Sequence, residues 1–282
     1  MATLIDGKAV AEKVRREAAR DVALAKTKDV EAGLAVILVG DDPASAKYVG
    51  MKARDCVECG IHAFDEHLPV STSQEELLSI VDEYNHDPFV HGILVQLPLP
   101  SHLDTEEVIA HISPEKDVDG FTAANLGRLM RGLDCFECCT PAGVMRLLEE
   151  YGIDPDGKRA VVIGRSLIVG RPLATLLTNA NATVTLCHSH TQGLQEICRE
   201  ADILVSAVGK AGLVDASYVK PGAVVIDVGT NMTENGLVGD VVFDEVEPVA
   251  SFITPVPGGV GPMTRALLMK NAAKAALAAV GR

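Results

Sequence analysis

Short apolar runs recur along the chain, and most are followed by a segment with helical periodicity. The runs are rich in Val, Ile and Leu over their whole length: LAVILVG, VHGILVQL, RAVVIG, ADILVSAVG and AVVIDVG. A strand that is apolar on both faces is typical of a parallel sheet covered by helices. Since parallel strands need crossover connections, and helical segments separate these runs, the pattern predicts open α/β sheets.

The composition and charge of the chain restrict which partners it can bind and in which cellular compartment we expect it. The chain has 282 residues, long enough for two domains, and its 48% hydrophobic but only 4% aromatic content predicts aliphatic cores. The formal net charge of −14 comes with no basic block, which argues against nucleic acid or an anionic membrane as partner. There is no signal-peptide pattern and no apolar run of transmembrane length, and the seven cysteines are not spaced like a secreted disulfide framework, so we expect a cytoplasmic protein.

The order of the elements predicts two α/β domains joined by two long helices. We expect an open parallel sheet in residues 1–139 and a Rossmann-like dinucleotide-binding sheet in residues 140–262. The helix at 141–152 would lead into the second domain. The Ala-rich helix at 263–282 would pack back on the first domain and form the second bridge.

The helix expected after the first strand carries a candidate catalytic pair, Tyr48 and Lys52. Its start is marked by Asp42 and Pro43, a capping residue and a first-turn proline. The spacing i, i+4 places the phenol and the amine on one face. A partly desolvated lysine loses its proton more easily and can then act as a base near neutral pH. The structural alternative is a solvated lysine beside a half-buried tyrosine.

Gln96 ends the apolar run VHGILVQL, and Pro98 cannot continue a central strand. Ligands of open parallel sheets gather at the carboxyl ends of the strands. We therefore expect Gln96 to face the same crevice as Tyr48 and Lys52, where its amide can hold the lysine or orient a water. The alternative is a glutamine that only ends a strand.

The strand RAVVIG leads into a glycine-bearing turn and a helix, the start of a dinucleotide fold. The turn contains Gly164, Arg165 and Ser166, with Ser166 where the second glycine of the usual fingerprint would stand. The strand ATVTLC that follows ends in Cys187-His-Ser-His190, without the acid that NAD folds use for the ribose. A 2′-phosphate suits Arg and Ser better than a carboxylate does, so the pattern favours NADP.

Three groups of residues are candidate metal or ligand sites. Cys56 and Cys59 together with Cys135 and Cys138 would form a four-thiolate zinc site, and His188-x-His190 a two-histidine site. The long separation of the cysteine pairs and the lack of further ligands beside the histidines favour idle thiols and no metal. The acids Asp117 and Asp119 are either turn residues or acceptors for the amine edge of a ligand.

Six strings, in order along nearly the whole chain, resemble the bifunctional methylenetetrahydrofolate dehydrogenase/methenyltetrahydrofolate cyclohydrolase family. They are YVGMK, GILVQLPLP, PEKDVDGF, GRSLIVGRP, VGDV and ITPVPGGVGPMT. The resemblance implies two domains with a folate crevice between them, and a homodimer. It also implies NADP-dependent oxidation of 5,10-methylenetetrahydrofolate, followed by hydrolysis of the methenyl product to 10-formyltetrahydrofolate.

The resemblance also implies residue roles. Lys52 is the catalytic lysine, Tyr48 stacks on the folate, and Gln96 hydrogen-bonds Lys52 and helps to keep it unprotonated. The remaining folate contacts are Val95, Leu97, Asp119, Pro257, Gly258, Gly259 and Val260. The cofactor contacts are Gly164, Arg165 and Ser166 at the pyrophosphate, Arg165 and Ser189 at the 2′-phosphate, and Thr230 near the nicotinamide. Thr230 departs from the family, which usually has Ile before the Asn that is Asn231 here.

The sequence leaves three alternative functions. A short-chain dehydrogenase also uses Tyr-x-x-x-Lys, but its glycine-rich turn precedes that pair, whereas Gly164 follows Lys52 by over a hundred residues. A dehydrogenase without the hydrolase step would be separated by assaying the two reactions individually. A non-catalytic NADP-sensing protein would bind NADP and turn over no folate.

Overall fold

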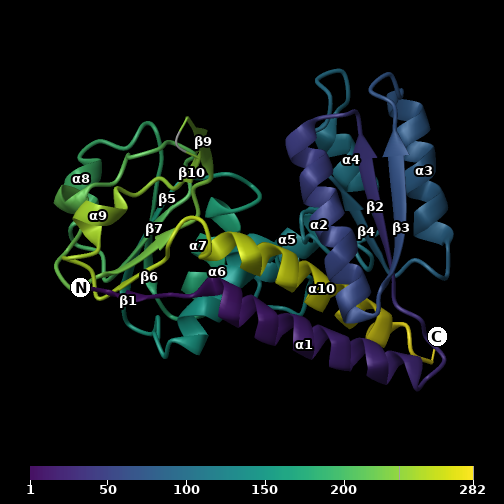
Figure 1. Ribbon diagram of the computed structural model, residues 1–282, viewed down its shortest axis with the longest axis horizontal. Helices are drawn as coiled ribbons and strands as arrows, with labels where there is room; N and C mark the ends of the chain where they lie inside the picture. The colour runs from purple at the N-terminus through teal and green to yellow at the C-terminus, as the bar shows by residue number, and fades with distance from the viewer. Residues whose placement is uncertain (235, 282) are drawn as a thin grey trace. The chain divides into compact units, whose positions relative to one another are not determined.

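The computed structural model describes residues 1–234 and 236–281, and the chain divides into two compact units. The six-stranded unit consists of Met1–Ala11 and Cys138–Thr264, and the three-stranded unit of Glu12–Glu137 and Arg265–Arg282. The chain passes from one unit to the other within α1 (Gly7–Lys26), just before α6 (Cys139–Glu150) and within α10 (Val260–Ala278) (Figure 1). The predicted fold class, parallel α/β sheets in two domains, is confirmed.

The three-stranded unit is built on a parallel sheet with β2 in its centre. Its order is β3 (His62–Leu68), β2 (Gly33–Val39), β4 (Gly92–Val95), and all seven residues of β2 are buried. The helices of this unit are α2 (Pro43–Cys59), α3 (Gln74–His86), α4 (Thr105–His111) and α5 (Ala123–Met130). One aliphatic core cluster joins β2 and β4 to α3 and α4, as expected of doubly apolar strands.

The helix boundaries of this unit follow local capping chemistry. Asp42 accepts a hydrogen bond from the N–H of Ser45 at 2.8 Å, and Pro43 is the first residue of α2. Ser73 and Glu76 form the predicted capping box at the start of α3. These caps determine where α2 and α3 begin. The start of α2 in turn determines which of its residues face β2.

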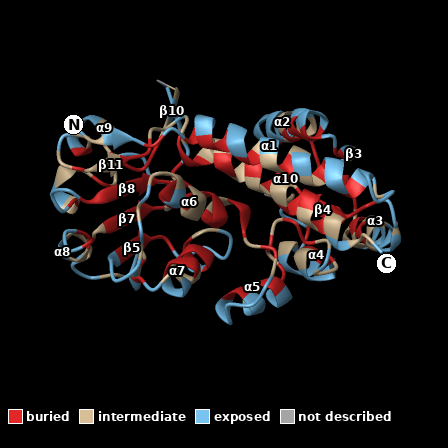
Figure 2. Ribbon diagram, turned by 90° about the horizontal axis from the view of Figure 1, so that it is seen from below, coloured by how far each residue is buried: buried red, intermediate tan, exposed pale blue. Residues whose placement is uncertain are grey.

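The six-stranded unit is a fully parallel sheet that lies in the order β1-β11-β8-β7-β5-β6. The strands are β1 (Thr3–Leu4), β5 (Arg159–Ile163), β6 (Thr183–Cys187), β7 (Ile203–Ser206), β8 (Val224–Asp227) and β11 (Phe252–Ile253). Figure 2 shows β7 and β8 as buried throughout. Because the chain places β6 on one side of β5 and β7 on the other, the order reverses at β5. Ligands of open sheets bind at the carboxyl ends beside such a point.

The smaller elements of this unit complete the layers around the sheet. They are α7 (Gly170–Asn179), α8 (Leu194–Cys198), α9 (Phe243–Val246), the 3-10 turn η1 (Ala216–Tyr218) and the antiparallel pair β9 (Asn231–Thr233) and β10 (Gly236–Val238). A buried cluster runs from β5 and β7 to Val214, Val241 and Val246. The segment after the β9–β10 pair is therefore anchored to the core of this sheet.

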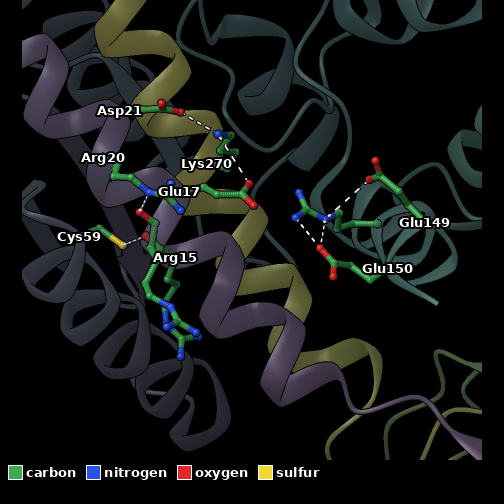
Figure 3. Close-up of polar contacts among 10 residues, drawn as sticks. Arg15, Glu17, Arg20, Asp21, Cys59, Glu149, Glu150 and Lys270 are labelled. Carbon is green, nitrogen blue, oxygen red and sulfur yellow. Dashed lines mark hydrogen bonds and ion pairs between the residues drawn. The ribbon is translucent and has the colours of Figure 1, made fainter. Parts of the chain in front are cut away.

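Helix α10 is tied to the three-stranded unit by polar contacts. Lys270 lies 2.7 Å from Asp21 and 3.9 Å from Glu17 of α1. Figure 3 shows Lys270 with these two acids. These partners are about one-third exposed, so each pair stabilises the contact only modestly. Asn271 is buried and donates to the carbonyls of Val118 and Glu137 at 2.8 and 3.1 Å. The predicted packing of the C-terminal helix on this unit is thus seen for its residues from Arg265 onward.

Three features differ from the sequence-based expectation. Residues 1–11 lie with the six-stranded unit, because β1 pairs with β11. The helices that span the division are α1 and α10, whereas α6 begins beside it. Helix α5 and the β9–β10 pair were not anticipated, since both are short and contain glycine. No helix among the described residues is long and apolar enough to cross a membrane.

Candidate active site and dinucleotide site

Lys52 and Gln96 meet in the three-stranded unit. Lys52 is only 7% exposed, and its Nζ donates a hydrogen bond to Gln96 Oε1 at 2.9 Å. The backbone N–H of Gln96 donates to the carbonyl of Ile37, which extends the β2–β4 ladder by one residue past Val95. The predicted contact between the lysine and the end of this strand is therefore present. This hydrogen-bond partner of the lysine is an uncharged amide.

The face of α2 that carries Lys52 is buried and unusually polar. Its buried residues recur at helical spacing: Ser45, Lys52, Asp55, Cys56 and Cys59. Arg265 of α10 lies 2.8 Å from Asp55 Oδ2 at an angle outside hydrogen-bond geometry, so the contact is ionic. Burial raises the pKa of Asp55, and the charge of Arg265 opposes that rise. The carboxylate one turn beyond Lys52 thus has its own cationic partner.

The other predicted folate contacts of this unit lie around that pair. Tyr48 lies one turn before Lys52 on α2 and is 36% exposed, so its ring is open to a ligand. Val95 is buried in β4, whereas Leu97 is half-buried in the segment after it. The aromatic ring, the amine and the amide come from α2 and the end of β4, as their sequence positions predicted.

The two acids of the DVDG segment separate into different environments. Asp117 is 1% exposed, and its carboxylate accepts from the N–H groups of Phe121 and Thr122 and from the side chain of Asn125 at 2.8–3.0 Å. It is therefore the residue that shapes the entry into α5. Asp119 is half-buried on the other side of Val118. Of the two alternatives given by the sequence, the turn role belongs to Asp117, and Asp119 stays the predicted ligand contact.

The turn after β5 has the shape of a phosphate cradle. Gly164 has φ of 117°, and a Cβ there would lie 2.2 Å from the carbonyl oxygen of Ala207. A Cβ on Gly170, the first residue of α7, would lie 1.9 Å from the carbonyl oxygen of Gly164. Ser166 Oγ accepts from the N–H groups of Val169 and Gly170 at 3.1 and 3.3 Å. The serine thus caps the helix start that a glycine would leave open, and its O–H stays able to donate to a phosphate.

The end of β6 supplies the second part of this site. The desolvation of His188, together with the charges of Arg165 and His190, lowers the pKa of His188. The N–H of Gly164 donates to the carbonyl of Cys187 at 2.9 Å, so the turn that carries Arg165 lies beside the end of β6, where Ser189 is exposed. An arginine and a serine suit a phosphate group, and the residues present therefore fit a dinucleotide with a 2′-phosphate.

The remaining predicted contacts also lie in the six-stranded unit. Thr230 is exposed just after β8, and residues 257–260 precede or begin α10. Gly259 donates to the carbonyl of Pro255 at 2.8 Å, and a Cβ on Gly7 would lie 1.7 Å from Gly259 O. The start of α1 therefore lies directly against the glycine-proline loop.

The cysteines and histidines considered as metal ligands have other environments. Burial raises the pKa of Cys56 to about 12 and that of Cys59 to about 11, so both are thiols at neutral pH. Cys59 donates to the carbonyl of Arg15 (Figure 3). No group of three His, Cys, Asp or Glu side chains within residues 1–234 and 236–281 has the arrangement of a metal site.

Sequence reasoning assigned no role to two acids of the six-stranded unit. Asp227 ends β8 and is 3% exposed, and Asp240 of the VGDV string is fully buried. The signal available in the sequence was an acid at the end of an apolar strand and another between a glycine and a valine run.

Comparisons with known proteins agree with this geometry. The model of the tetrahydrofolate dehydrogenase/cyclohydrolase catalytic domain matches residues 5–119, and that of the NAD(P)-binding domain of the same family matches residues 138–280. A relative from Moorella thermoacetica, "Bifunctional protein FolD", is 55% identical over 98% of this chain and 99% of its own. The chain belongs to the tetrahydrofolate dehydrogenase/cyclohydrolase family.

Two solved structures of this family have nearly the same fold. The bifunctional methylenetetrahydrofolate dehydrogenase/cyclohydrolase from Campylobacter jejuni is 51% identical, covers 98% of this chain and 99% of its own, and has a TM-score of 0.96. The Trypanosoma brucei enzyme, complexed with NADP cofactor and inhibitor, is 42% identical over 100% of this chain and 99% of its own, with a TM-score of 0.94.

Membership of the tetrahydrofolate dehydrogenase/cyclohydrolase family confirms the predicted activity. The protein is a bifunctional enzyme that oxidises 5,10-methylenetetrahydrofolate with a nicotinamide dinucleotide and hydrolyses the methenyl product to 10-formyltetrahydrofolate. Neither a dehydrogenase without the hydrolase step nor an NADP sensor finds support in these matches. The roles of individual residues stay predictions.

Proposed function

We propose that Lys52, Gln96 and Tyr48 carry the cyclohydrolase step and that NADP is the dinucleotide of the dehydrogenase step. The observation that carries the first part is the 2.9 Å hydrogen bond between the buried Lys52 Nζ and an uncharged amide oxygen. Burial disfavours a charged amine, and an amide oxygen offsets that effect less than a carboxylate in its place would. A lysine held in this way is suited to act as a base.

The hydrolysis needs a group that takes a proton from water. The methenyl carbon is electrophilic, and Lys52 Nζ in its neutral form accepts the proton of the attacking water. Gln96 Oε1 accepts a hydrogen bond from Nζ and so fixes the direction of the nitrogen lone pair. Tyr48, one turn before Lys52 on α2, offers an exposed ring on which the flat pterin can stack.

The oxidation depends on position more than on proton transfer. When bound, NADP supplies the hydride acceptor. The N–H groups at the start of α7, Ser166 Oγ and the turn around Gly164 would hold its pyrophosphate, and Arg165 with Ser189 its 2′-phosphate. Thr230 would lie near the nicotinamide. On the folate side, Val95, Leu97 and Asp119 would contact the pterin, and residues 257–260 of the six-stranded unit are further folate contacts of this proposal.

The remaining expectations concern the state of the protein in the cell. We propose a homodimer that acts on small folate derivatives in the cytoplasm and has no nucleic-acid partner. None of the seven cysteines, all of which lie within the described residues, forms a disulfide, as reducing compartments favour. The net charge of −14 repels polyanions.

The test of the lysine assignment is Lys52→Met, with Lys47→Met as the matched control on an exposed face of the same helix. Hydrolysis of 5,10-methenyltetrahydrofolate is followed by absorbance, and NADP binding by thermal shift. We expect Lys52→Met to abolish enzymatic hydrolysis while NADP still stabilises the protein, and Lys47→Met to behave like the wild type. A folded Lys52→Met protein that still hydrolyses the substrate refutes the assignment.

A further inference from the structure

Asp240 organises the loop after β7 with one buried carboxylate. It is 0% exposed, and its two oxygens accept five hydrogen bonds at 2.8–3.3 Å. The donors are the hydroxyl of Ser206, the backbone N–H groups of Val208, Gly209 and Lys210, and the side-chain amide of Asn231. Because one side chain accepts from all five donors, the segments that carry them are held around a single point.

Asp227 holds the segment that carries Asp240. Its Oδ1 accepts from the N–H groups of Gly229 and Asp240 at 2.9 and 3.0 Å, and its Oδ2 from the N–H of Val241 at 2.9 Å. The end of β8 therefore fixes the backbone of Asp240, while the side chain of Asp240 reaches back to the end of β7. The two acids form one continuous set of bonds across neighbouring strand ends.

A side chain on either of two neighbouring glycines would clash with the carboxylates of Asp227 and Asp240. A Cβ on Gly229 would lie 2.2 Å from Asp240 Oδ1, and a Cβ on Gly239 would lie 1.8 Å from Asp227 Oδ2. Each carboxylate is thus pressed against the backbone of a glycine. The segment VGDV needs both its glycine and its acid for this contact.

The loop that Asp240 holds lies against the phosphate turn. Ala207 is in that loop, its N–H donates to the carbonyl of Ile163 at 2.8 Å, and its carbonyl oxygen occupies the space next to Gly164. The loop also borders the point where the strand order reverses at β5. On the other side, Asn231 follows Thr230, the predicted neighbour of the nicotinamide. A shift of the loop would therefore move both the phosphate turn and the nicotinamide side.

We propose that Asp240 is a positioning residue for the dehydrogenase step, which holds the β7 loop and the Thr230–Asn231 segment in the shape that binds the dinucleotide. The proposal rests on the dinucleotide site described under the proposed function. It deepens that function, because it assigns the shape of the site to a residue that does not touch the cofactor. Asp227 supports Asp240 in this role.

The bifunctional enzyme provides an internal control for this proposal. Hydrolysis of 5,10-methenyltetrahydrofolate needs no dinucleotide, and Lys52 and Gln96 lie in the other unit. A residue that positions the dinucleotide should therefore change the KM for NADP and leave the hydrolysis unchanged. A residue that only stabilises the fold would change the melting temperature and leave the KM for NADP of the folded protein as it was.

The test uses Asp240→Asn and the milder Ser206→Ala, which removes one donor to the carboxylate. Asp202→Asn is the matched control, because Asp202 also accepts a backbone N–H of this sheet, that of Arg159, just before β7. Each variant is assayed for the KM and kcat of NADP reduction, for methenyl hydrolysis, and for the thermal shift caused by NADP.

We expect Asp240→Asn to raise the KM for NADP about tenfold or more, equivalent to about 1.4 kcal/mol of binding, with hydrolysis within about twofold of the wild type. Ser206→Ala should raise the KM for NADP by a few fold without changing kcat. Asp202→Asn should change neither. An unchanged KM for NADP in folded Asp240→Asn, or an equal fall of both activities, overturns the proposal.

Ser206→Ala decides the question if Asp240→Asn does not fold. A raised KM for NADP with intact hydrolysis then supports the proposal, and an unchanged KM overturns it. Wild-type protein that fails to reduce NADP with methylenetetrahydrofolate would instead count against the proposed function. That outcome is read from the wild type alone, so the two failures are distinguishable.

Discussion

Lys52 Nζ donates to Gln96 Oε1 across 2.9 Å, from α2 to the residue that follows β4. An amide oxygen can accept from an amine as well as from an ammonium, whereas a carboxylate in the same place would favour the ammonium far more strongly. The nearby carboxylate of Asp55 lies against Arg265. The surroundings of Lys52 thus contain a hydrogen-bond acceptor that is not an anion.

Gln96→Glu should therefore impair hydrolysis by holding Lys52 in its charged form. An adjacent carboxylate raises the pKa of a lysine by about one unit or more, so we expect hydrolysis at pH 7 to fall about tenfold or more and to recover as the pH rises. The measurement is the pH profile of methenyl hydrolysis, corrected for the uncatalysed rate. Gln96→Met is the neutral comparison, and a Gln96→Glu profile that coincides with it would show that charge at this position is irrelevant.

Arg165→Ala should separate NADP from NAD. Arg165 lies in the turn whose Gly164 donates to the carbonyl of Cys187 at the end of β6, and its charge contributes to lowering the pKa of His188. We expect the KM for NADP to rise about tenfold and that for NAD to change by less than about twofold, because NAD has no 2′-phosphate. Arg199→Ala, an exposed arginine at the end of α8, is the control. Equal losses for the two cofactors would contradict the assignment.

Asp117→Asn should mainly lower the stability of the fold, whereas Asp119→Asn should mainly weaken substrate binding. Asp117 accepts from three donors at the start of α5, so its replacement should cost about 1–3 kcal/mol of unfolding free energy. Asp119→Asn should raise the KM for methylenetetrahydrofolate and leave the unfolding free energy within about 0.5 kcal/mol. Denaturant unfolding and steady-state kinetics on both proteins check this, and a reversed pattern would exchange the two roles.

Asp227→Asn should change how stability depends on pH. Burial raises the pKa of Asp227 to about 6 from 3.8, and the neighbouring charge of Asp240 adds to the rise. A carboxyl with a raised pKa contributes stability below pH 3.8 that is lost as the pH rises to about 6.

The wild type should therefore lose about 3 kcal/mol or less relative to Asp227→Asn between pH 4 and 6, since each unit is worth about 1.4 kcal/mol. The measurement is denaturant unfolding of both proteins across that range, in which acid effects common to both cancel. A constant difference between the two proteins would mean that Asp227 does not titrate there.

The long, strongly patterned segments were predictable from the sequence. The apolar run before Val39 gave β2, and Asp42 with Pro43 gave the start of α2, so the relation of Tyr48 to Lys52 followed from helix geometry. The position of Gln96 followed from the rule that ligands gather at strand ends. Local patterns were sufficient wherever one element determines the site.

The rest depends on contacts between distant segments. Strand β1 has two residues and exists because β11 pairs with it, and no periodicity marks a strand so short. Helix α5 is fixed by Asp117 and Thr122, which cap it from a turn that reads as a plain loop. The burial of Asp227 and Asp240 depends on which strands become neighbours. The sequence shows two acids, and only the sheet order brings them together.

The interleaved chain path has a practical consequence for dissection of the molecule. A fragment that ends at Glu137 would begin with eleven residues that belong to the six-stranded unit. It would lack the segment from Arg265 onward, which provides the cation beside Asp55 and the amide that binds the Val118 carbonyl. The buried carboxylate of Asp55, three residues after Lys52, would be left without the charge of Arg265. To produce the three-stranded unit as a separate protein, residues 265–282 would therefore have to be fused to residues 12–137.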